Sequence, residues 1–454
     1  MLRSPVRLTR GRAVRSDGYD TDALALDHSP APNLLPTAPI GIVGLGYVGL
    51  PLAVTFAESG CTVIGIDAAE RVVAGVNAGT SHIEDIAPER LAPLVASGAI
   101  RASGDWAEIS ACRAIVICLP TPLNTHREPD LAIVLSAALE LSAHLQRGQL
   151  VVLESTTYPG TTRGELRMAL EGGSGLRAGI DFHLAFSPER VDPGRVDFTT
   201  KSTPKVVGGL TPQCTELAAS LYRTFCERVV VVGSPEVAEM SKLLENIFRA
   251  VNIALVNELA MLCDRMDVDV WEVIDAAATK PFGFMPFRPG PGLGGHCIPI
   301  DPFYLTWKAR EFDFHTEFIE LAGKVNSQMP AFCVGKVVRA LNSQRKPLNG
   351  SRVLVLGVAY KKDVSDMRES PALRIIELLH ADGADVRYHD PHVPELREFG
   401  LQSVPLTEEE LSAADCTVVV TDHSIVDYAH VAATSPLTVD LRNVVAPSDT
   451  VVRL

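Results

Sequence analysis

The stretch GIVGLGYVGLPLAVTFAESGCTVIGID, from Gly41 to Asp67, decides the fold of the N-terminal half of the chain. It reads as a buried strand, a turn with Gly44, Gly46 and Gly49, an apolar helix, a second strand and an acid at Asp67. Glycines in this order let backbone amides approach a pyrophosphate at the positive end of a helix, while the acid accepts hydrogen bonds from the adenosine ribose. The pattern predicts a dinucleotide site, and the acid favours NAD over NADP. Tight-turn glycines without a ligand are the alternative.

Short apolar stretches continue along the chain at the spacing of strands that are separated by helices. In the N-terminal half they cover 114–120, 149–156, 205–210 and 228–233, and in the C-terminal half 352–360, 385–390, 416–422 and 437–443. Successive β-α-β units predict a parallel sheet that helices cover on both faces. Between the halves, Ser234 as N-cap and Pro235 at the first helical position begin one long helix that runs to about Asp264.

We therefore expect an α/β fold with two Rossmann-like, doubly wound parallel-sheet domains joined by a long central helix. The expected segments are a flexible tail over 1–37, an NAD-binding Rossmann domain over 38–233, a central helical dimerisation and catalytic segment over 234–330, and a second Rossmann-like domain over 331–454. The tail has five Arg before Asp17 and no periodic apolar pattern, which is typical of a disordered extension. A transit peptide is the alternative.

Composition narrows the class of protein. The chain has 454 residues, a formal net charge of −14 and 46% hydrophobic residues, which is the profile of an ordinary globular protein. The negative field disfavours a nucleic-acid partner, and no apolar run reaches the roughly 18 residues that cross a bilayer, so we expect no membrane span. The nine cysteines are scattered without a zinc-type spacing, so we expect no metal site and a reducing, cytoplasmic compartment.

Cys297 stands in the glycine-rich stretch RPGPGLGGHCIPID, from Arg288 to Asp301. So many glycines expose backbone rather than pack it, which favours a thiol that faces a ligand cleft. A structural thiol in a tight loop is the alternative, and metal binding through His296 is a weaker one. Beside a dinucleotide site, a cysteine nucleophile suggests that an aldehyde is carried on to an acid, because hydride then leaves from a thiohemiacetal. The pattern therefore indicates a four-electron oxidation. Asp301 lies near the thiol if a helix starts after the loop.

The long helix carries a polar line, Lys242, Asn246 and Arg249, on an otherwise apolar surface. Spacings of four and three residues place these side chains on one face. An ammonium and an amide there are suited to stabilise a developing oxyanion, whereas a solvated stripe is the alternative.

Seven motifs together resemble the UDP-glucose/GDP-mannose dehydrogenase family over about residues 39–441. They are GIVGLGYVGLPLA, PTPLN, ESTTYPGTT, SPERVDPG, EMSKLLENIFRAVNIALVNELA, PGPGLGGHCIPIDP and GVAYKKDVSDMRESPA. The resemblance implies oxidation of the C6 alcohol of a UDP-sugar to a carboxylate, with two NAD⁺ reduced per sugar. It also implies that the second domain binds the UDP moiety, and that the central helix forms a homodimer or a higher homo-oligomer.

The resemblance also implies catalytic roles for individual residues. Cys297 is the expected covalent nucleophile, and Lys242 and Asn246 are the expected oxyanion-stabilising pair. Asp301, acting through an ordered water and Lys242, is expected to be part of the base for the first step.

Two further matches concern the water network and the last step. Thr156 resembles the threonine that holds this network, and Glu189 matches the first acid of a two-acid family segment. Pro193 stands where UDP-glucose enzymes have the second acid. This departure argues against UDP-glucose as substrate. It leaves the base for thioester hydrolysis open between Glu189 and a Lys–Asp water network.

The ligand contacts are expected at both glycine loops and at a basic turn in the second domain. The expected cofactor contacts are Gly44, Gly46, Tyr47, Val48, Gly49, Asp67, Arg71, Thr121 and Arg368. The expected substrate contacts are Arg190, Arg249, Gly294, Tyr360, Lys361 and Arg442. A basic turn after a parallel strand is where an anionic ligand is expected, although a solvated charge run is the alternative for Lys362.

The expected activity is NAD-dependent oxidation of a UDP-sugar at C6. The stretches GHCIPIDPFYLTWKA and PFGFMPF most resemble the UDP-N-acetylglucosamine branch of the family. UDP-glucose, UDP-N-acetylmannosamine and UDP-N-acetylgalactosamine are alternative substrates. An inactive nucleotide-sugar sensor is an alternative of another class, but a binder has no need of a nucleophile at Cys297.

Overall fold

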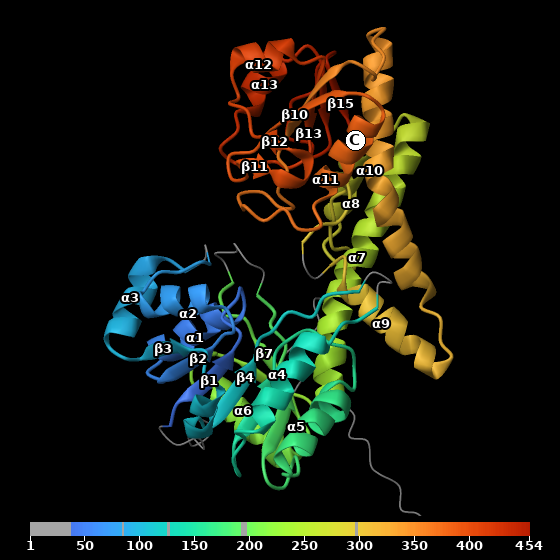
Figure 1. Ribbon diagram of the computed structural model, residues 1–454. Coiled ribbons are helices and arrows are strands. Elements are labelled where there is room, and N and C mark those ends of the chain that lie inside the picture. Colours follow the sequence, from blue (N-terminus) through green and yellow to red (C-terminus); the bar gives the residue numbers. More distant parts are fainter. Residues whose placement is uncertain (1–37, 84–85, 125–127, 192–197, 296–297) are drawn as a thin grey trace, which may run out of the picture.

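The structure is a computed structural model that describes residues 38–83, 86–124, 128–191, 198–295 and 298–454. Two sheets lie at opposite ends of two long helices, α7 (Pro235–Met266) and α10 (Glu317–Ser343), which run side by side (Figure 1). The blue-to-green sheet lies at one end and the red sheet at the other (Figure 1). The predicted pair of α/β domains joined by a long central helix is confirmed.

The first sheet has the strand order β3-β2-β1-β4-β5-β6-β7-β8. Its strands are β1 (Ile40–Val43), β2 (Val63–Ile66), β3 (Ile100–Ser103), β4 (Ala114–Ile117), β5 (Leu150–Leu153), β6 (His183–Phe186), β7 (Lys205–Gly209) and β8 (Val229–Val231). The pair β6 and β7 is antiparallel, so the expectation of an all-parallel sheet is wrong at this pair. No crossover helix is assigned in the described part of the connection 187–204, and without one a strand returns antiparallel.

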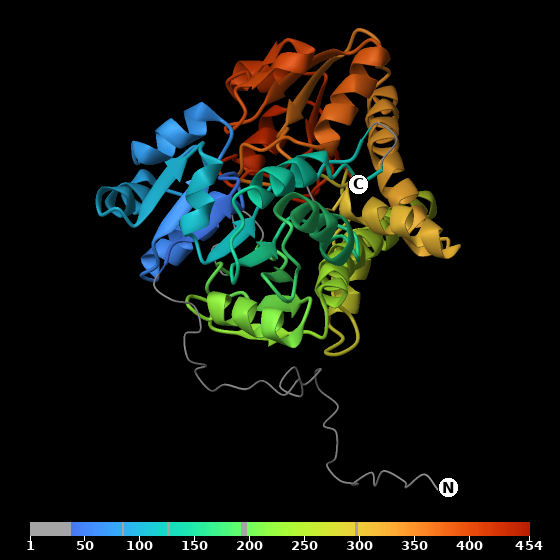
Figure 2. The ribbon, with the colours of Figure 1, turned by 60° about the horizontal axis from the view of Figure 1, so that its bottom comes forward.

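Helices cover both faces of this sheet (Figure 2). They are α1 (Gly49–Glu58), α2 (Glu70–Asn77), α3 (Pro88–Ala96), η2 (Trp106–Ala111), α4 (Ala132–Ser142), η3 (Thr162–Leu166), α5 (Arg167–Ser174) and α6 (Pro212–Tyr222). Adjacent residues of β1 show the two layers, because Ile42 packs with Phe56 of α1 whereas Val43 packs with Val134 and Leu141 of α4. Strands with apolar residues on both faces are typical of a buried parallel sheet.

Helix α7 begins where the sequence predicts, since the Ser234 hydroxyl accepts a hydrogen bond from Val237 N–H and Pro235 is the first helical residue. By length and composition α7 is apolar enough to cross a membrane, contrary to the expectation that no stretch is long and apolar enough. Such a helix is weak evidence for a membrane span, because core helices pass the same test. One third of its most apolar window is buried within the chain, against α10 and the first domain.

The segment between the two sheets continues with α8 (Val270–Ala278), α9 (Asp301–Ala309) and η4 (Arg310–Phe312) before α10. Helix α10 runs through position 331, at which we expect the fourth segment to begin, and Pro330 lies inside it. Proline removes one helical hydrogen bond, the one to the Asn326 carbonyl. A Cβ on Gly292 would lie 3.4 Å from that carbonyl oxygen, so the glycine-rich stretch packs against the gap in the helix.

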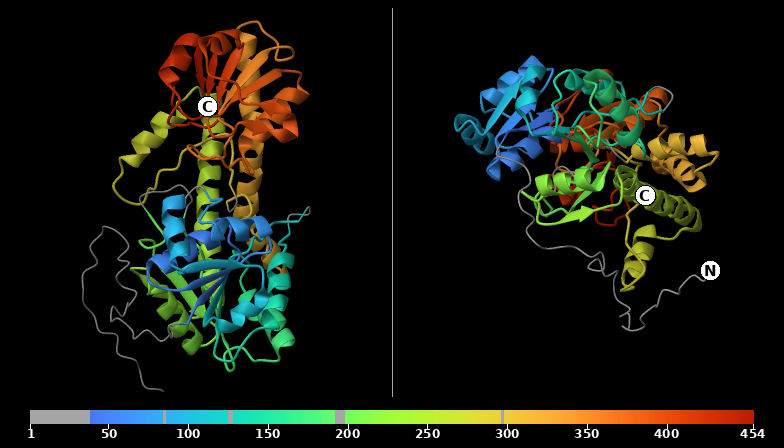
Figure 3. Two further views of the ribbon diagram at one scale, coloured as in Figure 1. Left: turned by 60° about the vertical axis from the view of Figure 1, so that its left-hand side comes forward. Right: turned by 90° about the horizontal axis from the view of Figure 1, so that it is seen from below.

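The second sheet is parallel throughout its described pairs, in the order β10-β9-β13-β14-β15. The elements are β9 (Arg352–Leu356), α11 (Pro371–Ala381), β10 (Asp385–His389), β11 (Glu395–Leu396), η5 (Arg397–Phe399), β12 (Leu401–Gln402), α12 (Glu408–Ala413), β13 (Cys416–Val419), α13 (Tyr428–Thr434), β14 (Thr438–Asp440) and β15 (Val451–Arg453). Figure 3 shows this domain at the far end of α7 and α10 from the first sheet.

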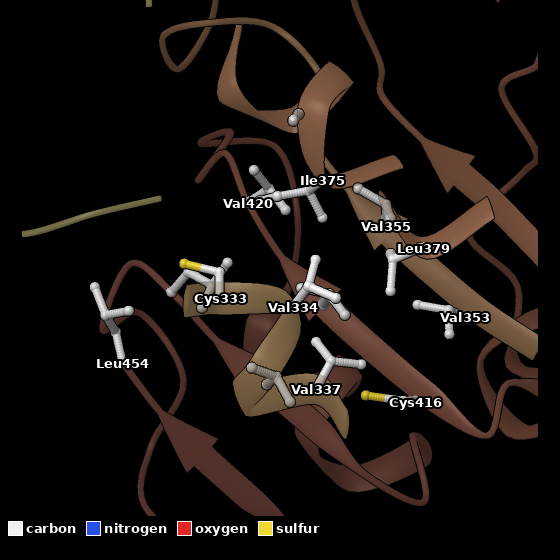
Figure 4. Close-up of a cluster of buried hydrophobic side chains, with 14 of the residues drawn as sticks. Cys333, Val334, Val337, Val353, Val355, Ile375, Leu379, Cys416, Val420 and Leu454 are labelled. Atoms are coloured by element: carbon white, nitrogen blue, oxygen red, sulfur yellow. The ribbon is translucent and has the colours of Figure 1, made fainter. Parts of the chain in front are cut away.

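The core of the second domain includes α10 as well as the sheet. Figure 4 shows side chains of α10, β9, α11 and β13 gathered in one cluster, namely Cys333, Val334, Val337, Val353, Val355, Ile375, Leu379 and Cys416. All of them are 5% exposed or less. Because α10 contributes to this core and also packs on α7, the second domain is fixed to the central helix by an apolar interface.

Candidate active site

The first glycine loop joins β1 to α1. Gly44 has a φ of +89°, and a Cβ on Gly49 would lie 1.8 Å from the Gly44 carbonyl oxygen, so side chains are excluded at both positions. A Cβ on Gly46 would meet nothing within 4 Å, and the first turn of α1 carries no acid. The open space in front of the helix N-terminus fits a pyrophosphate.

Asp67 follows β2 and faces the same loop. Its two carboxylate oxygens accept hydrogen bonds from Leu45 N–H and Ala69 N–H, both at 2.9 Å. These bonds hold the carboxylate at the end of the strand, where the ribose of a dinucleotide lies in this fold. The residues of this loop therefore fit NAD.

The other expected cofactor contacts lie at three places around the loop. Val48 is the N-cap of α1, and Arg71 is exposed in the first turn of α2. Thr121 lies after β4, where its hydroxyl donates to the Thr156 carbonyl at 2.7 Å. Tyr47 is about half exposed, and the guanidinium of Arg368 from the second domain lies 4.9 Å from its ring centroid.

Asp301 meets the polar line of the long helix at the start of α9. Asp301 is 3% exposed, and its carboxylate accepts a hydrogen bond from the Asn246 amide. Burial raises the pKa of Asp301 to about 6, against the opposing effects of the Lys242 charge and the Asn246 hydrogen bond. Lys242 is itself 9% exposed. The structure thus brings Lys242, Asn246 and Asp301 together, and a carboxyl with this pKa is suited to exchange protons near neutral pH.

Arg249, the third member of the polar line, is exposed and lies apart from this cluster. It lines a cavity of about 560 Å³ together with Phe287, Gly290 and Arg442. Arg442 is fixed by a 2.6 Å hydrogen bond from Nε to the Val420 carbonyl. The cavity therefore holds two of the expected substrate-binding arginines.

Cys297 and its neighbour His296 lie outside the described residues, and so does Pro193. The residues on either side of the cysteine are described. Gly292 and Ile298 line a cleft of about 940 Å³ that also includes Asn124 of the first domain and Arg368 of the second. The described residues on either side of positions 296–297 therefore lie at the border of the two domains.

The loop 357–369, which we call the junction loop, packs on the glycines before Cys297. A Cβ on Gly294 would lie 2.7 Å from the Tyr360 Cβ, and one on Gly295 would lie 2.9 Å from the Tyr360 ring. Gly295 N–H also donates to the Arg368 carbonyl at 3.1 Å. The structure thus places the expected substrate residues Gly294, Tyr360 and Lys361 on or beside one junction.

Glu189 lies in a buried charge cluster that sequence reasoning missed. The Lys205 ammonium contacts Glu189 and Glu154, each at 3.1 Å, and the Tyr222 hydroxyl donates to Glu154 at 2.5 Å. Burial alone would raise the pKa of Glu189, but Lys205 and two backbone amides hold it below its usual value. Opposite charges at the end of β5 and the start of β7, both otherwise apolar strands, are the sequence signal for this cluster.

Arg190 connects the same loop to α7 rather than to an open substrate site. Its guanidinium pairs with Glu245 at 2.7 Å and donates to the Pro204 carbonyl at 2.7 Å. Thr156 offers its carbonyl to Thr121, as described above. The Arg190–Glu245 pair thus holds the segment after β6 against the central helix, and the Thr121–Thr156 bond joins the ends of β4 and β5.

A glycine turn opposite an acid, in one chain with a buried Lys–Asn–Asp cluster, is the residue set of an NAD-dependent dehydrogenase. Models of the UDP-glucose/GDP-mannose dehydrogenase family match its NAD binding domain over residues 38–226, its central domain over 236–328 and its UDP binding domain over 354–447. The chain belongs to this family, and it is an NAD-dependent oxidoreductase with a separate domain for UDP.

Similar proteins align with this chain over most of its length. The UDP-N-acetyl-D-mannosamine dehydrogenase of Pyrococcus horikoshii is 38% identical over 85% of this chain and 89% of that protein. The UDP-N-acetyl-D-glucosamine 6-dehydrogenase of Pseudomonas aeruginosa is 36% identical over 85% of this chain and 90% of that protein. The solved structure of the UDP-D-ManNAc dehydrogenase from Pyrococcus horikoshii has a TM-score of 0.84 at 35% identity, covering 91% of this chain and 98% of that one.

Proposed function

We propose that this enzyme oxidises the C6 hydroxyl of UDP-N-acetylglucosamine to the carboxylate, in two hydride transfers. The observation that carries the proposal is the buried cluster of Lys242, Asn246 and Asp301, in which Asp301 stands four residues after Cys297 in the sequence. UDP-N-acetylmannosamine is the second candidate substrate, because a relative named for it is as similar as the relative named for N-acetylglucosamine.

In the first oxidation the protein removes the hydroxyl proton. Asp301, as a carboxylate, accepts this proton through a water that Lys242 and the Thr156 region hold in place. Bound NAD⁺ supplies the hydride acceptor. The products of this step are the C6 aldehyde and a protonated Asp301, which returns its proton to solvent.

In the second oxidation Cys297 adds to the aldehyde carbon. The C6–S bond forms, and the charge on the new oxyanion is stabilised by the Lys242 ammonium and the Asn246 amide. Loss of a second hydride from C6, for which a second NAD⁺ would replace the NADH formed in the first oxidation, gives a thioester. Water then adds to C6, the C6–S bond breaks, the Cys297 thiolate leaves, and the base takes the proton from water.

We assign this last proton to Asp301 rather than to Glu189. Glu189 already accepts hydrogen bonds from Lys205 and from two backbone amides, Arg190 N–H and Val191 N–H. An ammonium at 3.1 Å makes a carboxylate a weaker base. The Asp301 pKa of about 6 is closer to neutral pH, where general bases are most effective.

We also propose a homodimer that forms along α7. One face of this helix exposes large apolar side chains at intervals of three, four or seven residues: Val237, Met240, Leu244, Phe248, Leu255, Leu259, Leu262 and Met266, each between 37% and 62% exposed. An apolar face of this length on a soluble protein marks an interaction surface. A second copy supplies the same face in antiparallel or crossed orientation.

The proposal is tested by NADH release with a panel of UDP-sugars. We expect the largest kcat/KM with UDP-N-acetylglucosamine, and lower values with UDP-N-acetylmannosamine, UDP-N-acetylgalactosamine and UDP-glucose. A larger kcat/KM with UDP-N-acetylmannosamine would assign the second candidate. Tight UDP binding without NADH release from any sugar would instead identify a sensor.

A further inference from the structure

Two buried side chains, Asp390 and His423, lie beneath the junction loop 357–369. Asp390 follows β10 and His423 follows β13, the two strands that flank β9, and the loop itself starts at the end of β9. His423 is 0% exposed and Asp390 is 3% exposed. Neither residue has a place in the proposed reaction.

The hydrogen bonds fix the tautomer of His423. Asp363 N–H lies 3.0 Å from His423 Nδ1, and an amide N–H can only donate, so Nδ1 is an acceptor. The ring hydrogen is therefore on Nε2, which donates to the Asp390 carboxylate at 3.0 Å. The same Asp390 oxygen accepts Val358 N–H at 2.7 Å and Ala359 N–H at 3.0 Å.

These two side chains hold three backbone amides of the junction loop. Asp363, the last of the three anchored residues, has a φ of +60°, and its carboxylate accepts hydrogen bonds from Ser424 N–H and the Ser424 hydroxyl at 2.8 and 2.6 Å. The loop thus takes its shape from the 423–424 segment. Asp390 and His423 fix the backbone conformation of the junction loop by accepting these amide hydrogen bonds.

The opposite side of the junction loop touches both other parts of the site. Tyr360 packs on Gly295, two residues before Cys297, and the Arg368 carbonyl accepts Gly295 N–H. The Arg368 guanidinium lies over the Tyr47 ring of the NAD loop. A displacement of this loop therefore moves residues at the nucleotide, at the cysteine stretch and at the cofactor loop together.

We propose that His423 is a positioning residue: its Nδ1 acceptor fixes the junction loop in the shape that binds the UDP diphosphate and supports the glycines beside Cys297. The proposal rests on the proposed function, because it assigns the loop to UDP recognition. It goes beyond that function by naming a residue that touches no substrate and still sets substrate affinity.

Two substitutions distinguish the role of His423 Nδ1 from the role of Nε2. In His423→Asn the amide oxygen takes the place of Nδ1 and keeps the acceptor for Asp363 N–H. In His423→Gln the amide group reaches toward Asp390 and the Nδ1 acceptor is lost. We expect His423→Asn to keep the Kd for UDP within about threefold, and His423→Gln to raise it by about tenfold or more, since a buried amide loses its partner.

The measurements are titration calorimetry with UDP and with NAD⁺, and steady-state kinetics with the UDP-sugar. With His423→Gln, the Kd for UDP and the KM for the sugar nucleotide should rise together, while the Kd for NAD⁺ rises by a smaller factor, because Arg368 is the one expected cofactor contact on this loop. Equal loss of UDP affinity in both variants, or loss in neither, would overturn the proposal. If the wild type itself fails to bind UDP, the proposed function fails instead.

His392→Gln is the matched control. Its ring lies 5.0 Å from that of His423, and Asp363, His392 and His423 present ligand atoms within 4.8 Å of one another. Both His423 nitrogens are engaged by protein, so we expect no change in UDP affinity with His392→Gln or after EDTA treatment. A change in either would identify a cation site and contradict the positioning role.

If His423→Gln does not fold, a substitution at an exposed residue of the same anchor tests the proposal instead. Ser424→Ala removes the hydroxyl that holds the Asp363 carboxylate, at an exposed position. We expect a two- to fivefold rise in the Kd for UDP, and faster amide exchange in 357–369. Unchanged affinity and exchange would show that this anchor does not shape the loop.

Discussion

Replacing Asp301 by Asn should stabilise the protein at pH 8 and lower its activity by several orders of magnitude. Burial raises the pKa of this carboxyl to about 6 from its usual 3.8, so the folded protein binds its proton more tightly than the unfolded chain does. Stability therefore falls as pH rises from about 4 to about 7. A separation of about two pH units corresponds to about 3 kcal/mol of unfolding free energy.

The neutral amide that Asp301→Asn introduces does not ionise, so the variant does not lose unfolding free energy in this way as pH rises. We expect this variant to match the wild type near pH 4 and to exceed it by up to about 3 kcal/mol at pH 8. The gain is smaller if the new NH₂ group faces the Lys242 ammonium. In the same variant kcat/KM should fall by about 10² to 10⁴, the usual contribution of a general base. The wild type should lose kcat/KM below about pH 6, where Asp301 is protonated, and the variant should not show this fall.

Urea unfolding followed by tryptophan fluorescence measures this difference, because Trp307 lies on the same helix as Asp301. Asp313→Asn is the control, since Asp313 is exposed in the same part of the chain and should show no pH-dependent gain. A variant that is less stable than the wild type at pH 8, or a gap that does not change with pH, would refute the reasoning.

Three further predictions concern the cofactor, the buried charges and the dimer. Asp67→Ala should raise the Kd for NAD⁺ about tenfold or more without changing the Kd for UDP, by calorimetry, because it removes the acceptor of the ribose and of two loop amides. Lys205→Met should lower the unfolding free energy by about 3 to 5 kcal/mol, since it leaves Glu154 and Glu189 buried and unpaired, and an unchanged urea midpoint would contradict this. Leu244→Glu should convert the dimer to a monomer in sedimentation velocity, and a dimer of unchanged mass would place the interface elsewhere.

Local signals account for the parts of the fold that the sequence predicts. The glycine turn, the Asp67 position and the Ser234–Pro235 helix start each depend on residues near one another in the chain, and each is found as expected. The antiparallel pair of β6 and β7 depends on a connection with no assigned crossover helix in its described part, for which the strand pattern gives no signal. The run of α10 through Pro330 depends on packing, because the glycine-rich stretch covers the gap in the helix.

The site was predictable as a set of residue types rather than as an arrangement. Helical spacing placed Lys242 and Asn246 on one face, and the structure brings Asp301 to them from 55 residues away from Asn246. The partners of Glu189 come from other strands, so sequence reasoning could name Glu189 as a base but not see that Lys205 already neutralises it. Arg249 shares the face of the polar line, yet lies on another cavity, because it stands two turns, about 10 Å, further along the helix axis than Lys242.

The most direct test of the central claim is the number of NADH formed per sugar, with wild type and Cys297→Ser, and with product mass measured in parallel. The account predicts two NADH and a C6 carboxylate from each UDP-N-acetylglucosamine, and a serine variant that stops after the first hydride or retains a covalent adduct. One NADH with release of the aldehyde by the wild type, or full turnover by the serine variant, would contradict it.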